Sequence, residues 1–258
     1  MKKIEEALEA FKNKDYEHAL DLFSSIVEKG EESAEIYNNM GLCYYNLGNY
    51  EKAEDIFLKA IKLNSKLPQI YVNLADLYYK LHDFDSGIQL LSQGVYEMPD
   101  EMILAHYLAR FYMEDARLDL AIDELEKILE KQPENYDAYY DLGKVHFELG
   151  NYALAAENFE NVLEFKNNNE WIYYYLGQAY EANDEIDKAL SNFLKAIAFN
   201  ESFHPAYKKA AILFLARGEY EDAIEYFESY MDLNIPNDEK NNIKTLIERI
   251  KKKQKNER

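Results

Sequence analysis

The sequence predicts an all-α fold, built as a linear array of stacked helix hairpins. The first observation is a pattern of small and apolar residues that recurs every 34 residues along most of the 258-residue chain. The second is that apolar residues within each period recur at i, i+3, i+4 and i+7, the spacing of one helix face. The third is the low content of chain-breaking residues, nine Gly and five Pro, which leaves room only for short turns.

Residues 34–65 show one such hairpin. Gly48 and Asn49 separate its two helical patterns, and both residue types tolerate the left-handed backbone conformation of a tight turn. We expect the small residues Gly41, Ala53 and Ala60 to lie where the two helix backbones approach closely. The two stripes are Tyr37, Met40, Gly41 and Tyr44, followed by Ala53, Ile56, Phe57 and Ala60.

The same residue types return at the same positions of later periods. Tyr37 is repeated as Tyr71, Tyr139, Tyr173 and Tyr207, Ala53 as Ala19, Gly87, Ala121, Ala155, Ala189 and Ala223, and Phe57 as Phe23, Leu91, Leu125, Phe159, Phe193 and Phe227. A fixed period of this length is typical of repeat arrays, because one hairpin cannot bury its own apolar face and needs neighbours on both sides.

On these residues the chain resembles a tetratricopeptide-repeat (TPR) protein. The resemblance implies a right-handed superhelical solenoid of about seven helix-turn-helix TPR units plus a C-terminal capping helix. The family's proline near the end of the unit is present only as Pro99 and Pro133. The units are expected near residues 1–33, 34–67, 68–101, 102–135, 136–169, 170–203 and 204–237, so that the array covers 1–237, with a capping helix over 238–254 and a tail at 255–258.

The junction of the third and fourth units is the least regular part of the pattern. Gly87 and Gly94 replace alanines on a second helix, Ala105 stands where other units have tyrosine, and Ile128 stands where most have a smaller residue. Each glycine in a helix interior costs about 1 kcal/mol relative to alanine. We therefore expect altered curvature or local opening at this junction.

The last segment contains one apolar stripe on a predicted amphipathic helix. Ile243, Leu246, Ile247 and Ile250 form the stripe, which we expect to cover apolar surface on the last hairpin, including Phe227 and Tyr230. Residues 238–258 carry eight basic and four acidic side chains. This basic end is interpreted as favouring the helix C-terminus and solubility, with a weak membrane or nucleic-acid contact as the alternative.

Charge and composition favour a cytoplasmic protein that does not bind nucleic acid. The formal net charge is −20, so a polyanion would meet long-range repulsion. The sequence has neither a run of 18 apolar residues nor a signal-peptide core, so stable membrane insertion is not expected. The one cysteine, Cys43, is expected to be a buried core thiol.

The sequence predicts no enzyme, cofactor or metal site. It contains no phosphate loop, HExxH, GxSxG or CxxC motif. The five histidines are scattered over different units, and His146 falls at a core position of the repeat. Carboxylates are abundant, but on helical repeats they normally form a solvated face.

The resemblance implies that the first helix of each hairpin lines a concave groove. Inward-facing positions of these helices are less acidic than the whole chain and rich in aromatic and amide side chains, which suit contacts with an extended peptide. Packing against neighbouring helices is the alternative role for each aromatic. The candidate groove residues are Asn38, Asn39, Tyr45, Asn73, Tyr79, Tyr107, Arg110, Tyr140, Lys144, Phe147, Trp171, Tyr174, Tyr175, Gln178, Lys208 and Lys209.

Some TPR grooves clamp the terminal carboxylate of chaperone tails with lysine, asparagine and arginine side chains. Asn39 and Asn73 match one slot of that clamp, but the expected basic residues around them are missing, so a chaperone-tail adaptor is disfavoured. Arg110 and Lys144 occupy equivalent slots and are candidates for contact with an acidic ligand group. An ion pair between Arg110 and Asp141 is the alternative.

The sequence thus predicts a non-enzymatic interaction scaffold that binds a peptide or protein segment in its groove. Two alternatives stay open at this stage. One is a self-assembling structural array, because the outer face of the first unit is a candidate for binding a neighbouring copy. The other is an accessory subunit of an enzyme complex whose catalytic domain is on another chain.

Overall fold

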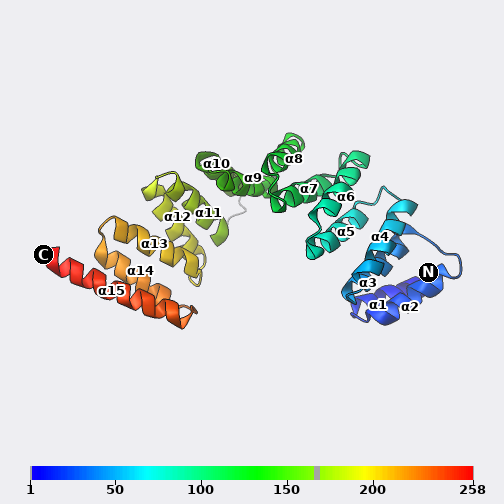
Figure 1. Cartoon of the computed structure of the whole chain (residues 1–258), viewed down its shortest axis with the longest axis horizontal. Coiled ribbons are helices and arrows are strands. Elements are labelled where there is room, and N and C mark those ends of the chain that lie inside the picture. Colours follow the sequence, from blue (N-terminus) through cyan, green and yellow to red (C-terminus); the bar gives the residue numbers. More distant parts are fainter. Residues whose placement is uncertain (1, 166–168, 258) are drawn as a thin grey trace. The chain divides into compact units, whose positions relative to one another are not determined.

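The computed structural model describes residues 2–165 and 169–257, with side chains described as far as residue 255. Within this part of the chain the structure contains fifteen α-helices and no strand, so the all-α prediction is confirmed (Figure 1). The chain divides into two compact units, Met1–Pro133 and Glu134–Arg258. Each unit is a stack of helix hairpins.

Unit one contains four hairpins, each made of a first and a second helix. Consecutive helices pack against each other along the unit. The hairpins are α1 (Lys2–Lys12) with α2 (Tyr16–Val27), α3 (Ala34–Asn46) with α4 (Tyr50–Leu63), α5 (Pro68–Leu81) with α6 (Phe84–Glu97), and α7 (Met102–Glu114) with α8 (Leu118–Lys131).

Unit two contains three hairpins and a final single helix. The hairpins are α9 (Tyr136–Glu148) with α10 (Tyr152–Glu164), α11 (Glu170–Ala182) with α12 (Ile186–Phe199), and α13 (His204–Ala216) with α14 (Tyr220–Asp232), followed by α15 (Asn237–Glu257). The second helices mostly begin two residues after a left-handed turn residue, and several of them are capped by the intervening side chain. Asn49, for example, accepts a hydrogen bond from the backbone N–H of Lys52.

The turn between the two helices of each hairpin uses the left-handed backbone region at one fixed position. Gly48, Gly150 and Gly218 hold that position in three hairpins, with φ between +77° and +78°. Residues with a side chain hold it in the other four hairpins, although a Cβ disfavours this conformation. These residues are Lys14, His82, Ala116 and Asp184.

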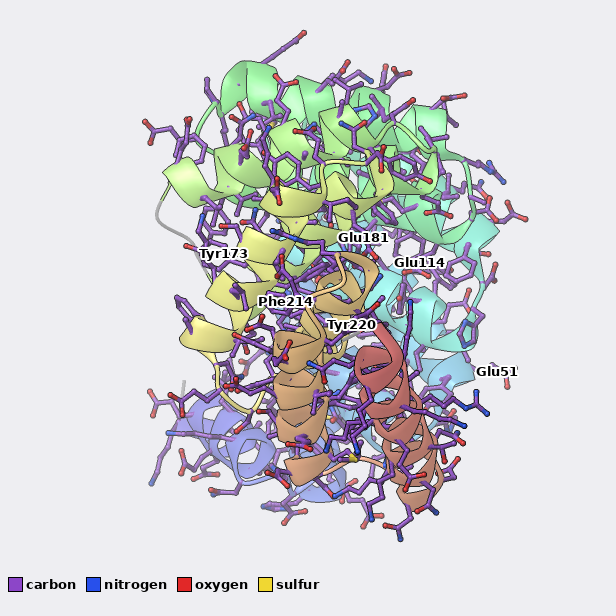
Figure 2. The ribbon with its side chains drawn as sticks, turned by 90° about the vertical axis from the view of Figure 1, so that its left-hand side faces the viewer. Glu51, Glu114, Tyr173, Glu181, Phe214 and Tyr220 are labelled. Atoms are coloured by element: carbon purple, nitrogen blue, oxygen red, sulfur yellow. The ribbon has the colours of Figure 1, made fainter. Side chains whose placement is uncertain are left out.

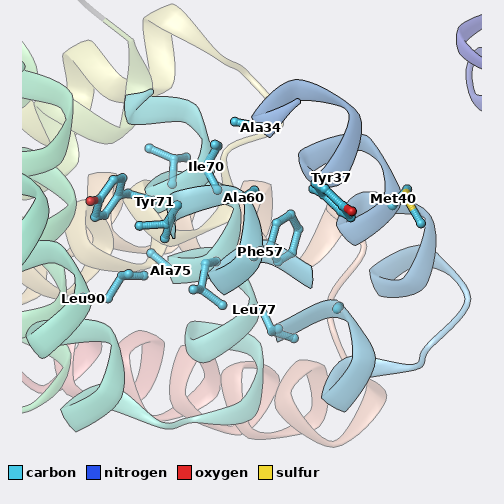
Figure 3. Close-up of a cluster of buried hydrophobic side chains, with 14 of the residues drawn as sticks. Ala34, Tyr37, Met40, Phe57, Ala60, Ile70, Tyr71, Ala75, Leu77 and Leu90 are labelled. Atoms are coloured by element: carbon cyan, nitrogen blue, oxygen red, sulfur yellow. The ribbon is translucent and has the colours of Figure 1, made fainter. Parts of the chain in front are cut away.

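The small first-helix residue of the repeat makes room for a ring on the second helix. A Cβ built on Gly41 would lie 2.6 Å from Cδ1 and Cε1 of Phe57, and Gly143 and Gly177 face Phe159 and Phe193 in the same way. The group that lies nearest to Gly41 is therefore the Phe57 ring. Phe57 is fully buried and lies among the core side chains drawn in Figure 3.

At the junction of the third and fourth hairpins the arrangement is reversed, because the glycine lies on a second helix and the aromatic ring on a first helix. Gly87 lies on the second helix α6, and a Cβ there would lie 2.0 Å from the Phe111 ring on the next first helix, α7. Gly94 similarly faces Tyr71 and Leu104. The two glycines that made this junction irregular in sequence thus accommodate larger partners, and α6 and α7 pack directly against each other.

Helix α15 covers the apolar end of unit two. Ile243, Ile247 and Ile250 are buried in one cluster with Phe227 and Tyr230. Figure 2 shows α15 beside the last hairpin, to which the labelled Phe214 and Tyr220 belong. Polar contacts extend the interface, since Lys251 Nζ lies 3.2 Å from a carboxylate oxygen of Glu228. This packing agrees with the predicted capping helix.

Candidate functional site

The first-helix face of unit one, formed by side chains of α3, α5 and α7, contains a pocket of about 410 Å³. All of its lining side chains lie at positions that the repeat register predicts to face inward. Tyr45 and Tyr79 supply aromatic walls, and Asn73 supplies an amide. The lining residues are Leu42, Tyr45, Asn73, Asp76, Tyr79 and Lys80.

A chain of amides crosses this face from α5 to α3. Gln69 Nε2 donates to Asn73 Oδ1 at 2.9 Å, and Asn73 Nδ2 donates to Asn38 Oδ1 at 2.8 Å. Asn73 is only 9% exposed, and the two bonds fix its orientation. Each group still has hydrogen-bonding capacity, since an amide nitrogen carries two protons and an amide oxygen two lone pairs. Asn39, the neighbouring candidate, is half-buried.

The cations of this face lie over tyrosine rings. Lys80 Nζ is 5.0 Å from the ring centroids of both Tyr45 and Tyr50, and the Arg110 guanidinium is 5.9 Å from that of Tyr107. Such contacts stabilise a cation by about 0.5–1 kcal/mol at exposed sites. Tyr50 is on a second helix, α4, and was not among the sequence candidates.

Asp76 is the acidic member of the pocket. Partial burial raises the pKa of its carboxyl above the ordinary value, while the nearby Arg110 guanidinium and the Tyr107 hydroxyl oppose the rise. The Tyr79 hydroxyl donates to Glu114 Oε1 at 2.9 Å. Asp141, the alternative partner of Arg110, is a buried residue of unit two. The pocket thus combines both signs of charge with aromatic and amide surface.

The equivalent face of unit two is dominated by aromatic rings. We call Tyr140, Trp171, Tyr174 and Tyr175 the aromatic platform. Tyr175 lies between Trp171 and Tyr140, with ring centroids 5.9 Å from each. Buried rings of the core support the platform, since Phe203 lies 4.7 Å from Trp171 and 5.5 Å from Tyr174. Trp171 remains 46% exposed despite these contacts.

The three candidate lysines of unit two already have partners within that unit. Lys209 Nζ lies 2.6 Å from Glu181 Oε2 on α11, and Lys208 Nζ lies 2.6 Å from Glu239 Oε1 on α15. Lys144 Nζ lies 5.5 Å from the Tyr140 ring centroid. The Lys208 pair could not be found from the repeat register, because Glu239 lies outside the array.

The sixteen sequence candidates therefore divide between two chemically different faces. The pocket of unit one includes Tyr45, Asn73 and Tyr79 among its lining residues, and Asn38 bonds to it through the amide chain. Phe147 packs against Tyr152 at 5.3 Å, so its ring takes part in hairpin packing. Leu42, Asp76 and Lys80 also line the pocket, and the 34-residue register was the sequence signal that could have added them to the candidates.

The described residues contain no group of three or more His, Cys, Asp or Glu side chains that could hold a metal ion. No helix within residues 2–165 and 169–257 has both the length and the apolar character needed to cross a bilayer.

Several segments of the chain match models of one repeat family. Family models described as "Tetratricopeptide repeat" match residues 34–67, 112–155 and 174–238, and one described as "TPR repeat" matches residues 143–184. The comparison with curated proteins finds no match.

Solved structures with the same fold include the C-terminal part of a TPR repeat-containing protein from Cytophaga hutchinsonii, at 20% identity and a TM-score of 0.77, covering 93% of this chain and 98% of that one. A TPR protein from Parabacteroides merdae has 18% identity and a TM-score of 0.66, with 96% and 97% covered. YrrB, described as a TPR protein with an unusual peptide-binding site, has 22% identity and a TM-score of 0.58, with 69% and 92% covered. The repeat register, the hairpin stack and these matches together establish that the chain belongs to the tetratricopeptide-repeat family.

Proposed function

We propose that this protein is a non-enzymatic interaction scaffold that binds a peptide or protein segment on the first-helix faces of its hairpins. TPR repeats are in general protein–protein interaction modules, and the structural relative YrrB is described as having a peptide-binding site. The observation that carries the proposal is the pocket of unit one, which is lined by a fixed amide and two tyrosines.

The chemistry of this pocket suits an extended peptide. The remaining N–H and lone pairs of Asn73 and its amide neighbours match the acceptors and donors of a peptide backbone. Tyr45 and Tyr79 provide rigid contact area at low conformational cost, as aromatic residues do at protein interfaces. Lys80 and Asp76 add one positive and one negative charge to the pocket. An acidic side chain of the bound segment would be attracted to Lys80, and a basic one to Asp76.

Peptide display on the full chain tests the proposal. A random dodecapeptide library is selected against the wild-type protein, and the affinity of the recovered peptides is measured for Tyr45→Ala and Tyr79→Ala. We expect each substitution to weaken binding by about tenfold or more, which corresponds to about 1.4 kcal/mol.

The matched control is Tyr96→Ala, because Tyr96 is 87% exposed on the second helix α6 of the same unit. Its affinity should equal that of the wild type. Recovered peptides that bind both pocket variants as tightly as the wild type would remove the pocket of unit one from the proposal. Light scattering of the free protein over a concentration series distinguishes the self-assembling alternative, which requires growth in mass.

A further inference from the structure

The aromatic platform of unit two contains hydrogen-bond donors for which the described part of the chain supplies no acceptor. The indole N–H of Trp171, the hydroxyl of Tyr174 and the side-chain amide of Gln178 make no hydrogen bond to any residue that the structure describes. Trp171, Tyr174, Tyr175 and Gln178 follow the i, i+3, i+4, i+7 spacing on α11, so they share one helix face. Ring faces and donors are therefore presented together.

The surroundings of the platform favour a ligand without charge. The carboxylate of Glu181 is 2.6 Å from Lys209 Nζ, and Glu170 accepts a hydrogen bond from Asn200 at 3.0 Å. Lys144 Nζ lies 5.5 Å from the centroid of the Tyr140 ring. A charged ligand group would have to compete with these contacts. An uncharged segment rich in acceptors complements the platform.

We infer that the aromatic platform binds an uncharged, proline-rich segment in the polyproline II conformation, an inference that rests on the proposed function and names one class of peptide for unit two. Proline has a backbone carbonyl but no N–H, so a proline-rich segment offers acceptors without competing donors. Its preformed helix loses little conformational entropy on binding and docks on aromatic-lined surfaces. Its rings stack on the faces of Trp171 and Tyr174.

The single tryptophan of the chain makes binding at the platform directly observable. N-acetylated, C-amidated decaproline is titrated into the full-length protein, and the emission of Trp171 is recorded. We expect a saturable change in emission. Glycine–serine and leucine–asparagine decapeptides with the same blocked ends should give no saturation, because they lack the preformed polyproline II helix.

Variants assign the site. Tyr174→Phe removes only a hydroxyl and should weaken decaproline binding about fivefold, the effect of one hydrogen bond. Trp171→Ala should weaken it at least tenfold, measured by the anisotropy of fluorescein-labelled decaproline. Tyr96→Phe, which removes a hydroxyl from α6 in unit one, is the control and should leave the affinity unchanged. Circular dichroism verifies that each variant keeps its helix content.

Each outcome decides between the two proposals. Saturable binding that the two platform variants weaken supports the inference. Binding that these variants leave unchanged overturns the assignment to the platform, and equal binding of the leucine–asparagine peptide overturns the preference for proline. If decaproline fails to bind while library-selected peptides bind at the unit-one pocket, the inference falls and the proposed function stands. If neither binds, both fall.

Discussion

Replacing Gly41 by alanine tests the packing of a helix glycine against a ring. In the native structure the new Cβ would lie 2.6 Å from two carbons of Phe57 and 2.9 Å from a third. Carbon atoms in favourable contact are about 3.5–4.0 Å apart, so the ring or the helix must move by about 1 Å. Phe57 is fully buried, and such overpacking costs about 1–3 kcal/mol.

Helix propensity acts in the opposite direction. Alanine is more favourable than glycine in a helix interior by about 1 kcal/mol. The expected net effect of Gly41→Ala is therefore a decrease of about 1 kcal/mol in the free energy of unfolding, within a range of about 0–2 kcal/mol. In a Phe57→Leu background the clash is removed, and the same substitution should stabilise by about 1 kcal/mol.

The assay is a double-mutant cycle followed by urea denaturation and circular dichroism. The coupling free energy between positions 41 and 57 should equal the overpacking term of about 1–3 kcal/mol. Gly143 and Phe159 provide an independent copy of the pair in unit two, with a closest distance of 2.6 Å. Additive effects within about 0.5 kcal/mol would refute the packing argument, as would stabilisation by Gly41→Ala in the wild-type background.

Three further predictions concern the turn, the thiol and the cap. Ala116→Gly should raise the free energy of unfolding by about 0.5–1 kcal/mol, because it relieves a Cβ at φ +55°, whereas Gly48→Ala should lower it; calorimetry of both variants checks the pair. Burial raises the pKa of Cys43 from 9.0 to about 12. The stability contributed by the neutral thiol is therefore present below about pH 9 and is lost as pH rises towards 12. In Cys43→Ala the free energy of unfolding should fall less steeply over that pH range than in the wild type. Truncation after Asn237 should expose Phe227 and Tyr230, so that α14 loses hydrogen-exchange protection first and light scattering increases. Unchanged protection of α14 would show that α15 is not a cap.

The helices and their hairpin order could be predicted because their signals are local. Each helix has an apolar stripe within a window of about 13 residues, and the 34-residue period aligns the stripes without gaps. The turn was recognisable at Gly48, because glycine favours a left-handed conformation more than other residues do. It was not recognisable at Lys14 or Ala116, because neither residue favours that conformation and the demand comes from the two helices that the turn joins.

Packing partners were harder to predict than secondary structure. The sequence marked Gly41 as a position of close approach, but only the structure shows that the approaching group is the Phe57 ring. The same limitation applied at the third junction, where Gly87 looked like a weakness. The small Gly87 leaves the space that the large Phe111 ring fills, so the total side-chain volume at this contact is kept. Because the two residues belong to different repeats, the sequence of a single repeat does not show that the glycine has a large partner.

Core positions of the repeat keep one kind of residue, whereas positions on the candidate faces vary and can therefore contribute to ligand binding. The core position of Ala53 admits only alanine or glycine in all seven hairpins, since a larger side chain has no space there. The inward position of Leu42 is less restricted in residue type, since it holds a different residue in each hairpin from the second to the seventh: Leu42, Asp76, Arg110, Lys144, Gln178 and Ile212. The register could locate these positions because backbone geometry repeats, but it could not give their pairing. The carboxylate of Asp76 faces Arg110 from the next hairpin, and Lys208 is paired by α15, so the charge that a ligand meets depends on neighbours that the period does not specify.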